Sequence, residues 1–228
     1  MQEAMAIYGN VECEGEAIEW VEFVYLGSKF SGWGEQVRDV KHRIAIGYQR
    51  FSEMYRIWSC DWADWALKKR LFMVYIQSTV LHGCETWRMD GKTERALNGF
   101  NSGCMAKMTG RTIHEEASNP TYNLVAAAYE RRRTWLGHVL RMEEGRYAKL
   151  ALQATFEADR NVSSSLVGRL VAGTDTTWAD LEELAGDQTE WRKESKATTK
   201  TLVEEKKEGA LRRNNRRTCR DNPVGGGV

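Results

Sequence analysis

Apolar side chains recur at steps of three and four residues through most of this chain, the spacing that places them on one face of an α-helix. In the first such stretch, between residues 35 and 58, the apolar stripe consists of Val37, Val40, Ile44, Tyr48, Phe51, Tyr55 and Trp58. Gly47 lies inside this stretch and weakens a helix by about 1 kcal/mol relative to alanine. The spacing predicts one amphipathic helix over residues 35–58.

A second helix is predicted from about residue 65 to residue 82, with Asp61 or Asp64 as its N-terminal cap. Its apolar positions form two rows. The first row is Leu67, Leu71, Val74 and Ser78, and the second is Phe72, Ile76 and Val80. Because a helix that is apolar on more than one side is usually buried, we expect this helix to be central.

Two more helical stretches follow. The stripe Leu97, Phe100, Cys104 and Met108 begins after Asp90-Gly91 and ends at Gly110, a residue typical of helix C-termini. After Asn119-Pro120, a further stretch runs to residue 141. From all these stripes we expect a buried core that includes Leu71, Ile76, Leu97, Phe100, Trp135, Leu136 and Leu140.

The two ends of the chain have different patterns. Residues 18–26 are aromatic and β-branched and stop at Gly27, which predicts a small antiparallel β element over residues 1–34. Residues 146–191 indicate a loop followed by a short helix. Residues 192–228 are polar and basic, which indicates either a poorly ordered, flexible tail or a lone charged helix. The sequence thus predicts a mainly α fold, with a helical body over residues 35–145.

Charge is segregated along the chain although the net charge is only +1. The net charge is −5 over residues 1–34, +6 over 35–150, −6 over 151–191 and +6 over 192–228. A basic body and a basic tail favour nucleic acid as a partner, whereas the near-neutral total supplies no strong overall attraction.

The cysteines and the hydropathy indicate where the protein resides. The five cysteines are scattered, without a Cys-x-x-Cys pair, at Cys13, Cys60, Cys84, Cys104 and Cys219. This spacing argues against a zinc ribbon or a disulfide framework. No signal segment and no membrane-spanning apolar run is visible, so we expect a reduced, intracellular protein that does not enter a membrane.

The sequence offers no catalytic residue, metal ligand set or cofactor motif. His114-Glu115-Glu116 lacks the second histidine of a His-Glu-x-x-His site, and the four histidines have no ligand spacing. Neither a phosphate-binding P-loop nor a nucleophile elbow occurs. We therefore expect no catalytic, metal or cofactor site, and no residue pattern supports a standalone enzyme.

Three strings carry a family resemblance: Tyr-Leu-Gly-Ser at 25–28, Gly-Cys-Glu-Thr-Trp at 83–87, and the run from Arg131 to Met142. Together they resemble the region after the polymerase palm in non-LTR (LINE-type) retrotransposon reverse transcriptases, from about Trp20 to Met142. The resemblance implies a primer-grip turn followed by a helical thumb and connection. The family's catalytic Asp-Asp turn lies upstream of Tyr-Leu-Gly, and no such pair precedes Trp20, so the chain is expected to be inactive alone.

The resemblance also implies nucleic-acid-binding residues. Tyr25 and Gly27 would bring the backbone close to a primer. Arg38, Lys41 and Arg43 would offer cations from the polar side of the first helix. Arg131, Arg132 and Arg133 would form an arginine patch. The partner would be RNA or an RNA–DNA duplex, bound nonspecifically.

The residues themselves leave a different interpretation open for each of these groups. Gly27 can be a plain strand-ending turn, charges on a helix are usually a solvated face, and Cys84 and Trp87 are expected to be structural. The alternative function is a helical interaction or scaffold module without nucleic-acid affinity.

Overall fold

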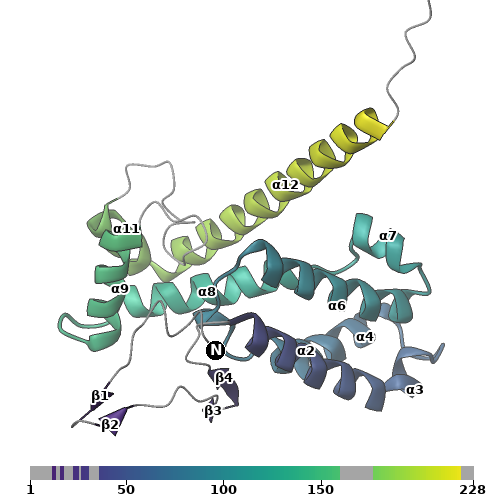
Figure 1. Ribbon diagram of the computed structural model, residues 1–228, viewed down its shortest axis with the longest axis horizontal. Helices are drawn as coiled ribbons and strands as arrows, with labels where there is room; N and C mark the ends of the chain where they lie inside the picture. The colour runs from purple at the N-terminus through teal and green to yellow at the C-terminus, as the bar shows by residue number, and fades with distance from the viewer. Residues whose placement is uncertain are drawn as a thin grey trace, which may run out of the picture. The chain divides into compact units, whose positions relative to one another are not determined.

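The structure is a computed structural model that describes residues 12–13, 16–17, 23–25, 27–30, 36–159 and 177–221 (Figure 1). These residues are mostly helical, which confirms the mainly α fold. The chain divides into two compact units, Met1–Val125 and Ala126–Val228, and each is described by itself. The division falls inside the segment 35–145 that the sequence analysis treats as one domain.

The described part of the N-terminal segment contains four very short strands. β1 (Glu12–Cys13) pairs with β2 (Glu16–Ala17), and β3 (Phe23–Tyr25) pairs with β4 (Ser28–Phe30), both antiparallel. The strands are two or three residues long, and most of residues 1–34 lie outside the described part of the chain. The β element over residues 1–34 therefore stays a prediction.

The helices of the first unit are α2 (Gln36–Glu53), α3 (Tyr55–Trp58), α4 (Trp65–Leu71), the π-helix η1 (Phe72–Gln77), α5 (Ser78–Val80), the 3-10 turn η2 (Cys84–Thr86), α6 (Gly91–Thr109) and α7 (Ile113–Ser118). The prediction of one helix over residues 35–58 is wrong, because the helix is interrupted at Met54, and α7 was not predicted. Asp64 caps α4 by accepting from the Leu67 amide, and Asp90 caps α6. Gly110 ends α6 with a φ of 72°, a left-handed conformation that favours glycine.

Only one of the two apolar rows in the predicted central helix is buried. Phe72, Ile76 and Val80 have no exposed surface, whereas Leu67 is 38% and Val74 is 56% exposed. α2 covers η1 and α5, and α6 touches α4, so one side of this helical stretch is enclosed and the opposite row is left uncovered. The expectation of a central helix, which rested on both apolar rows, is therefore wrong for the row that contains Leu67 and Val74.

Gly47 marks the closest approach of α2 to its neighbours. A Cβ at this position would lie 2.3 Å from Val80 Cγ2 and 3.2 Å from Phe100 Cζ. The distance to Val80 is far inside van der Waals contact and the distance to Phe100 is tight, so no other residue fits unless α2 or its neighbours shift. The helix propensity that glycine loses here is thus offset by the tight packing that it permits.

The second unit holds the remaining helices: α8 (Leu124–Leu140), of which residues from Ala126 belong to this unit, α9 (Tyr147–Asp159), α11 (Trp178–Gly186) and α12 (Gln188–Asp221). Its core is a cluster of Leu136, Val139, Leu140, Leu152, Phe156, Leu181, Ala185 and Trp191. Of the seven residues predicted to be buried, Leu71 and Trp135 are only half-buried, and the other five are buried.

The predicted tail begins within α12, which runs as one helix to Asp221. One of the two interpretations of residues 192–228 was a lone charged helix. The segment is helical to Asp221, but it is not alone, because Ser195 and Thr199 are buried, and the flexibility of the segment stays a prediction. Within the described residues, none of the helices has both the length and the apolar character needed to cross a membrane.

α8 and α12 touch at Gly137, where the indole of Trp191 takes the space of a side chain. A Cβ on Gly137 would lie 2.3 Å from Trp191 Nε1, and this nitrogen donates to the Arg133 carbonyl at 3.0 Å. We predict that Gly137→Ala destabilises the protein by about 1–3 kcal/mol because the added methyl group overfills the contact. Urea unfolding followed by circular dichroism measures the loss.

The matched control is Gly186→Ala, because a Cβ at Gly186 meets nothing within 4 Å. It should be neutral or slightly stabilising, since alanine is the better helix former. Equal stability of the two variants would show that the α8–α12 contact is not as close as described.

Candidate nucleic-acid interface

The Tyr-Leu-Gly turn lies against α2 within the first unit. Tyr25 pairs with Ser28 across the β3–β4 turn, and Gly27 has a φ of 80°. A Cβ on Gly27 would lie 3.0 Å from Nη2 of Arg43, so the glycine permits both the left-handed backbone and the close approach of the guanidinium. The Tyr25 side chain lies outside the described part of the structure.

Arg43 is buried, which corrects its assignment to the polar side of the first helix. Its side chain is 8% exposed, lies 3.9 Å from the Asp39 carboxylate and makes a 3.0 Å hydrogen bond with His82 Nδ1. Asp39 also accepts from Trp87 Nε1 at 2.9 Å. These contacts join α2 to the segment that follows α5, and periodicity could not reveal them because the partners are 39 and 48 residues apart.

The Gly-Cys-Glu-Thr-Trp string is therefore structural in this fold. Cys84 is fully buried and Trp87 is 2% exposed, as the sequence analysis expects. Cys104, in α6, is buried as well, and burial raises the pKa of its thiol to about 12. A thiol with this pKa is not a nucleophile near neutral pH.

Arg38 and Lys41 are both exposed on α2, as required of residues that contact phosphate. They are three residues apart, so they are neighbours on one side of the helix, between its N-terminus and Arg43. In the first unit, Gly27 thus contacts Arg43 of α2, the helix that also carries Arg38 and Lys41.

The three arginines at 131–133 are largely withdrawn from the surface. Arg131 is half-buried, while Arg132 is 3% and Arg133 is 6% exposed. The Arg133 guanidinium lies 5.6 Å from the centre of the Trp191 ring, and burial lowers its pKa to about 10 although Glu194 opposes the shift. Contact between Arg132 or Arg133 and a phosphate would require α8 to be uncovered, so their role as a binding patch stays a prediction.

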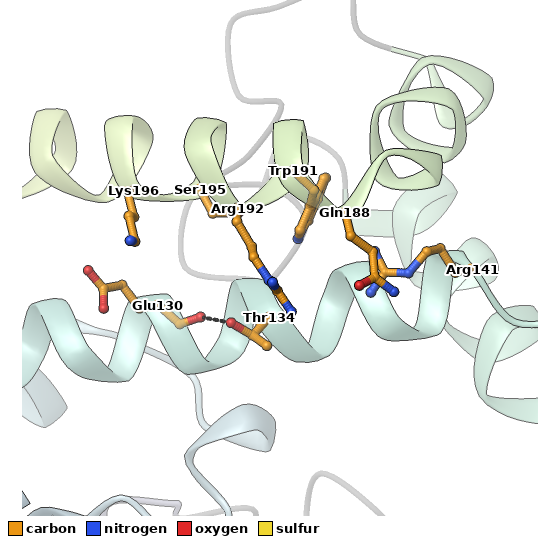
Figure 2. Close-up of a pocket in the computed structure, with 8 residues that line it drawn as sticks. All are labelled: Glu130, Thr134, Arg141, Gln188, Trp191, Arg192, Ser195 and Lys196. Carbon is orange, nitrogen blue, oxygen red and sulfur yellow. Dashed lines mark hydrogen bonds between the residues drawn. The ribbon is translucent and has the colours of Figure 1, made fainter.

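A cavity of about 120 Å³ lies between α8 and α12 in the second unit, and the sequence analysis did not anticipate it. Figure 2 shows its lining side chains, which come from α8, the residue after its end, and the first turns of α12: Glu130, Thr134, Arg141, Gln188, Trp191, Arg192, Ser195 and Lys196. A sequence signal did exist, because Gln188, Arg192, Ser195 and Lys196 recur at helical spacing on one side of α12.

No metal centre is visible in the part of the chain that the structure describes. No group of three or more histidine, cysteine, aspartate or glutamate side chains there has the arrangement to hold an ion. His114 and Glu115 are exposed, and the Glu116 carboxylate accepts a hydrogen bond from Arg111.

Comparison with known proteins gives no family for this chain. No family model, no curated protein and no solved structure matches it.

Proposed function

We propose that the chain is the region after the palm of a protein resembling non-LTR retrotransposon reverse transcriptases, and that it binds RNA or RNA–DNA duplexes nonspecifically. In this proposal residues 1–34 are a β-hairpin remnant of the primer grip, and residues 35–145 are the thumb and connection. The binding would rest on phosphate contacts, which need cations at the surface and no reading of bases.

The observation that supports the proposal best is the position of the Tyr-Leu-Gly turn. The Gly27 backbone lies against Arg43 of α2, and the exposed Arg38 and Lys41 lie earlier on the same helix. The turn therefore packs on the buried side of α2, and the same helix exposes two cations on its other side. Exposed cations suit a sugar-phosphate backbone better than they suit a small apolar ligand.

The binding experiment uses the full chain and a labelled RNA–DNA hybrid, with fluorescence anisotropy measured across a series of salt concentrations. We expect weak binding whose affinity falls steeply with salt, by about 0.7 to 0.9 logarithmic units per unit of log salt for each phosphate contact. Two hybrids of unrelated sequence should bind equally. A hybrid affinity that does not change with salt would contradict the proposal.

We also predict that the full chain incorporates no nucleotide on a primed template with magnesium or manganese. The reason is that two-metal polymerases need paired carboxylates, and the expected Asp-Asp turn does not occur upstream of Tyr25. A primer-extension assay with purified protein checks this. Template-dependent primer extension by the purified protein itself would overturn this prediction.

The second candidate function is a helical interaction or scaffold module, and one observation favours it. Several large apolar side chains are exposed on the first unit, including Tyr55 at 62%, Trp62 at 75% and Val74 at 56%. Exposed apolar side chains are common at protein interfaces. The hybrid-binding experiment separates the two functions, because a scaffold module has no affinity for the duplex.

A further inference from the structure

Two helical hydroxyl groups among the described residues, those of Ser195 and Thr199 on α12, are buried without a hydrogen-bond partner, and of the two only Ser195 lines a cavity. Serine and threonine inside a helix commonly donate to the carbonyl four residues earlier. The hydroxyls that do so here include Ser52, Ser59, Thr134, Thr155 and Thr201. Ser195 is 6% exposed, and its Oγ has no hydrogen-bond partner in the described part of the chain. A buried donor without a partner costs free energy unless a ligand satisfies it.

This hydroxyl lines the cavity between α8 and α12. Figure 2 shows Lys196 opposite Glu130 and Arg192 extending toward Thr134, while Arg141 lies near Gln188 at the other end. Trp191, whose indole takes the space beside Gly137, is one of the residues that line the cavity. Its volume of about 120 Å³ is well below the roughly 300–1,000 Å³ of pockets for organic ligands, so it suits a small ion or the end of a larger ligand.

The charges around the cavity are cationic. Arg141, Arg192 and Lys196 face a single carboxylate, that of Glu130. Among the described residues no carboxylate lies within 4.0 Å of Arg192 or Lys196. Arg141 donates through Nη1 to the Ala185 carbonyl at 2.9 Å, which fixes its position and leaves its other N–H groups available.

We propose that this cavity binds a phosphate group, with Ser195 Oγ donating from its floor and Arg192 and Lys196 neutralising the charge. Hydroxyl and guanidinium donors around a small space match a tetrahedral oxyanion. The Thr134 hydroxyl donates to the Glu130 carbonyl at 2.8 Å, so its proton is not available to the anion. The site shares no residue with the surface on α2, and it can exist whether or not the chain binds nucleic acid.

The phosphate group has two sources, a free phosphate ion and the backbone of a nucleic acid. The first arm of the test titrates the full chain with inorganic phosphate at constant ionic strength, using chloride as the balancing anion and calorimetry as the readout. We expect a dissociation constant on the order of 1 mM, typical of a small ion with a few charged contacts. The second arm repeats the titration with an RNA–DNA hybrid that lacks terminal phosphates.

The variants distinguish the cavity from general electrostatic attraction. Lys196→Gln should weaken phosphate binding by roughly three-fold or more, whereas Lys200→Gln, the same change one helical turn further along α12, should not. Ser195→Ala should weaken phosphate binding by roughly ten-fold, the loss expected for one hydrogen bond to a charged group. The same variant should unfold at a higher temperature without phosphate, because it removes a buried hydroxyl that has no partner.

The outcomes are distinct from those of the proposed function. Phosphate binding that is lost in Ser195→Ala and Lys196→Gln supports the site, even if the hybrid does not bind at all. The proposal is overturned if no phosphate binding is detected at phosphate concentrations up to roughly 20 mM, 20-fold above the expected dissociation constant. This holds even if the hybrid binds. It is also overturned if Lys196→Gln and Lys200→Gln weaken phosphate binding equally, or if Ser195→Ala binds phosphate as the parent does.

Discussion

Replacing Phe100 by alanine should cost about 3–5 kcal/mol of unfolding free energy, the range for an aromatic side chain removed from a packed core. Phe100 is 1% exposed and lies edge to face with Tyr48, with ring centres 4.7 Å apart. Its ring also lies close to Gly47 of α2, since a Cβ at that position would lie 3.2 Å from Phe100 Cζ. Chemical denaturation at 25 °C provides the measurement.

The control for this variant is Tyr55→Ala in the same unit, because Tyr55 is 62% exposed. A surface substitution of this kind should change the unfolding free energy by no more than about 0.5 kcal/mol. If Phe100→Ala and Tyr55→Ala were equally mild, α2 and α6 could not be packed as the structure describes.

The second large effect is expected at Glu116, a fully buried carboxylate on α7. It accepts hydrogen bonds from Thr121 Oγ1 at 2.6 Å, from the Thr121 amide at 2.9 Å and from Arg111 Nη1 at 2.8 Å. Glu116→Ala should cost about 3 kcal/mol, the lower end of the range for breaking a buried ion pair, because the Arg111 side chain remains 35% exposed and regains water.

The effect of Glu116 should depend on pH. Burial raises the pKa of Glu116, but the hydrogen bonds from Thr121 and the charge of Arg111 outweigh it and hold the pKa below its ordinary value of 4.5. The ionised form is therefore favoured in the folded state, and its stabilising contribution is present above pH 4.5 and is lost as the pH falls below that value.

The pH dependence is measured by comparing the parent with Glu116→Gln, which keeps the shape and cannot ionise. The difference in unfolding free energy between them should be largest above pH 4.5 and should shrink as the pH falls below that value. Glu53→Gln, at an exposed position of α2, provides the control and should change the unfolding free energy by no more than about 0.5 kcal/mol. A constant difference for Glu116→Gln on both sides of pH 4.5 would show that the carboxylate is not ionised in the fold.

Local features of the fold could be predicted from the sequence because they depend on neighbours in the chain. The cap at Asp64, one of the two candidates, the stop at Gly110 and the buried residues Leu97, Phe100 and Cys104 follow from spacing and from the chemistry of helix ends.

The contacts between distant residues could not be predicted in this way. Arg43 has the spacing of a polar-face residue, and its burial follows from partners far along the chain, His82 foremost. Gly47 looks like a defect in a helix until the helices that press on it are known. Ser195 is one hydroxyl among many in the sequence, and only the packing of α12 against α8 places it at a cavity.

The burial of Arg132 and Arg133 has the same origin. Three successive arginines favour a cationic patch, and the sequence gives no sign that Trp191 lies beside Arg133, 58 residues away. This contact also decides how nucleic-acid binding is tested. Truncation after Gly145 would remove Leu152, Phe156 and Trp191 and would expose the face of α8 that they cover, so substitutions in the full chain are preferable.

The most direct test of the proposed nucleic-acid binding is therefore the salt dependence of RNA–DNA hybrid affinity in two charge-matched double variants of the full chain. In Arg38→Ala/Lys41→Ala the proposed contacts of α2 are removed. In Arg95→Ala/Lys107→Ala two exposed cations of α6 are removed with the same change in net charge. The account predicts that the α2 variant loses about 1.4 to 1.8 units of slope in log affinity against log salt, and that the α6 variant retains the parental slope. Identical slopes for the parent and both variants would contradict it and would favour the scaffold function.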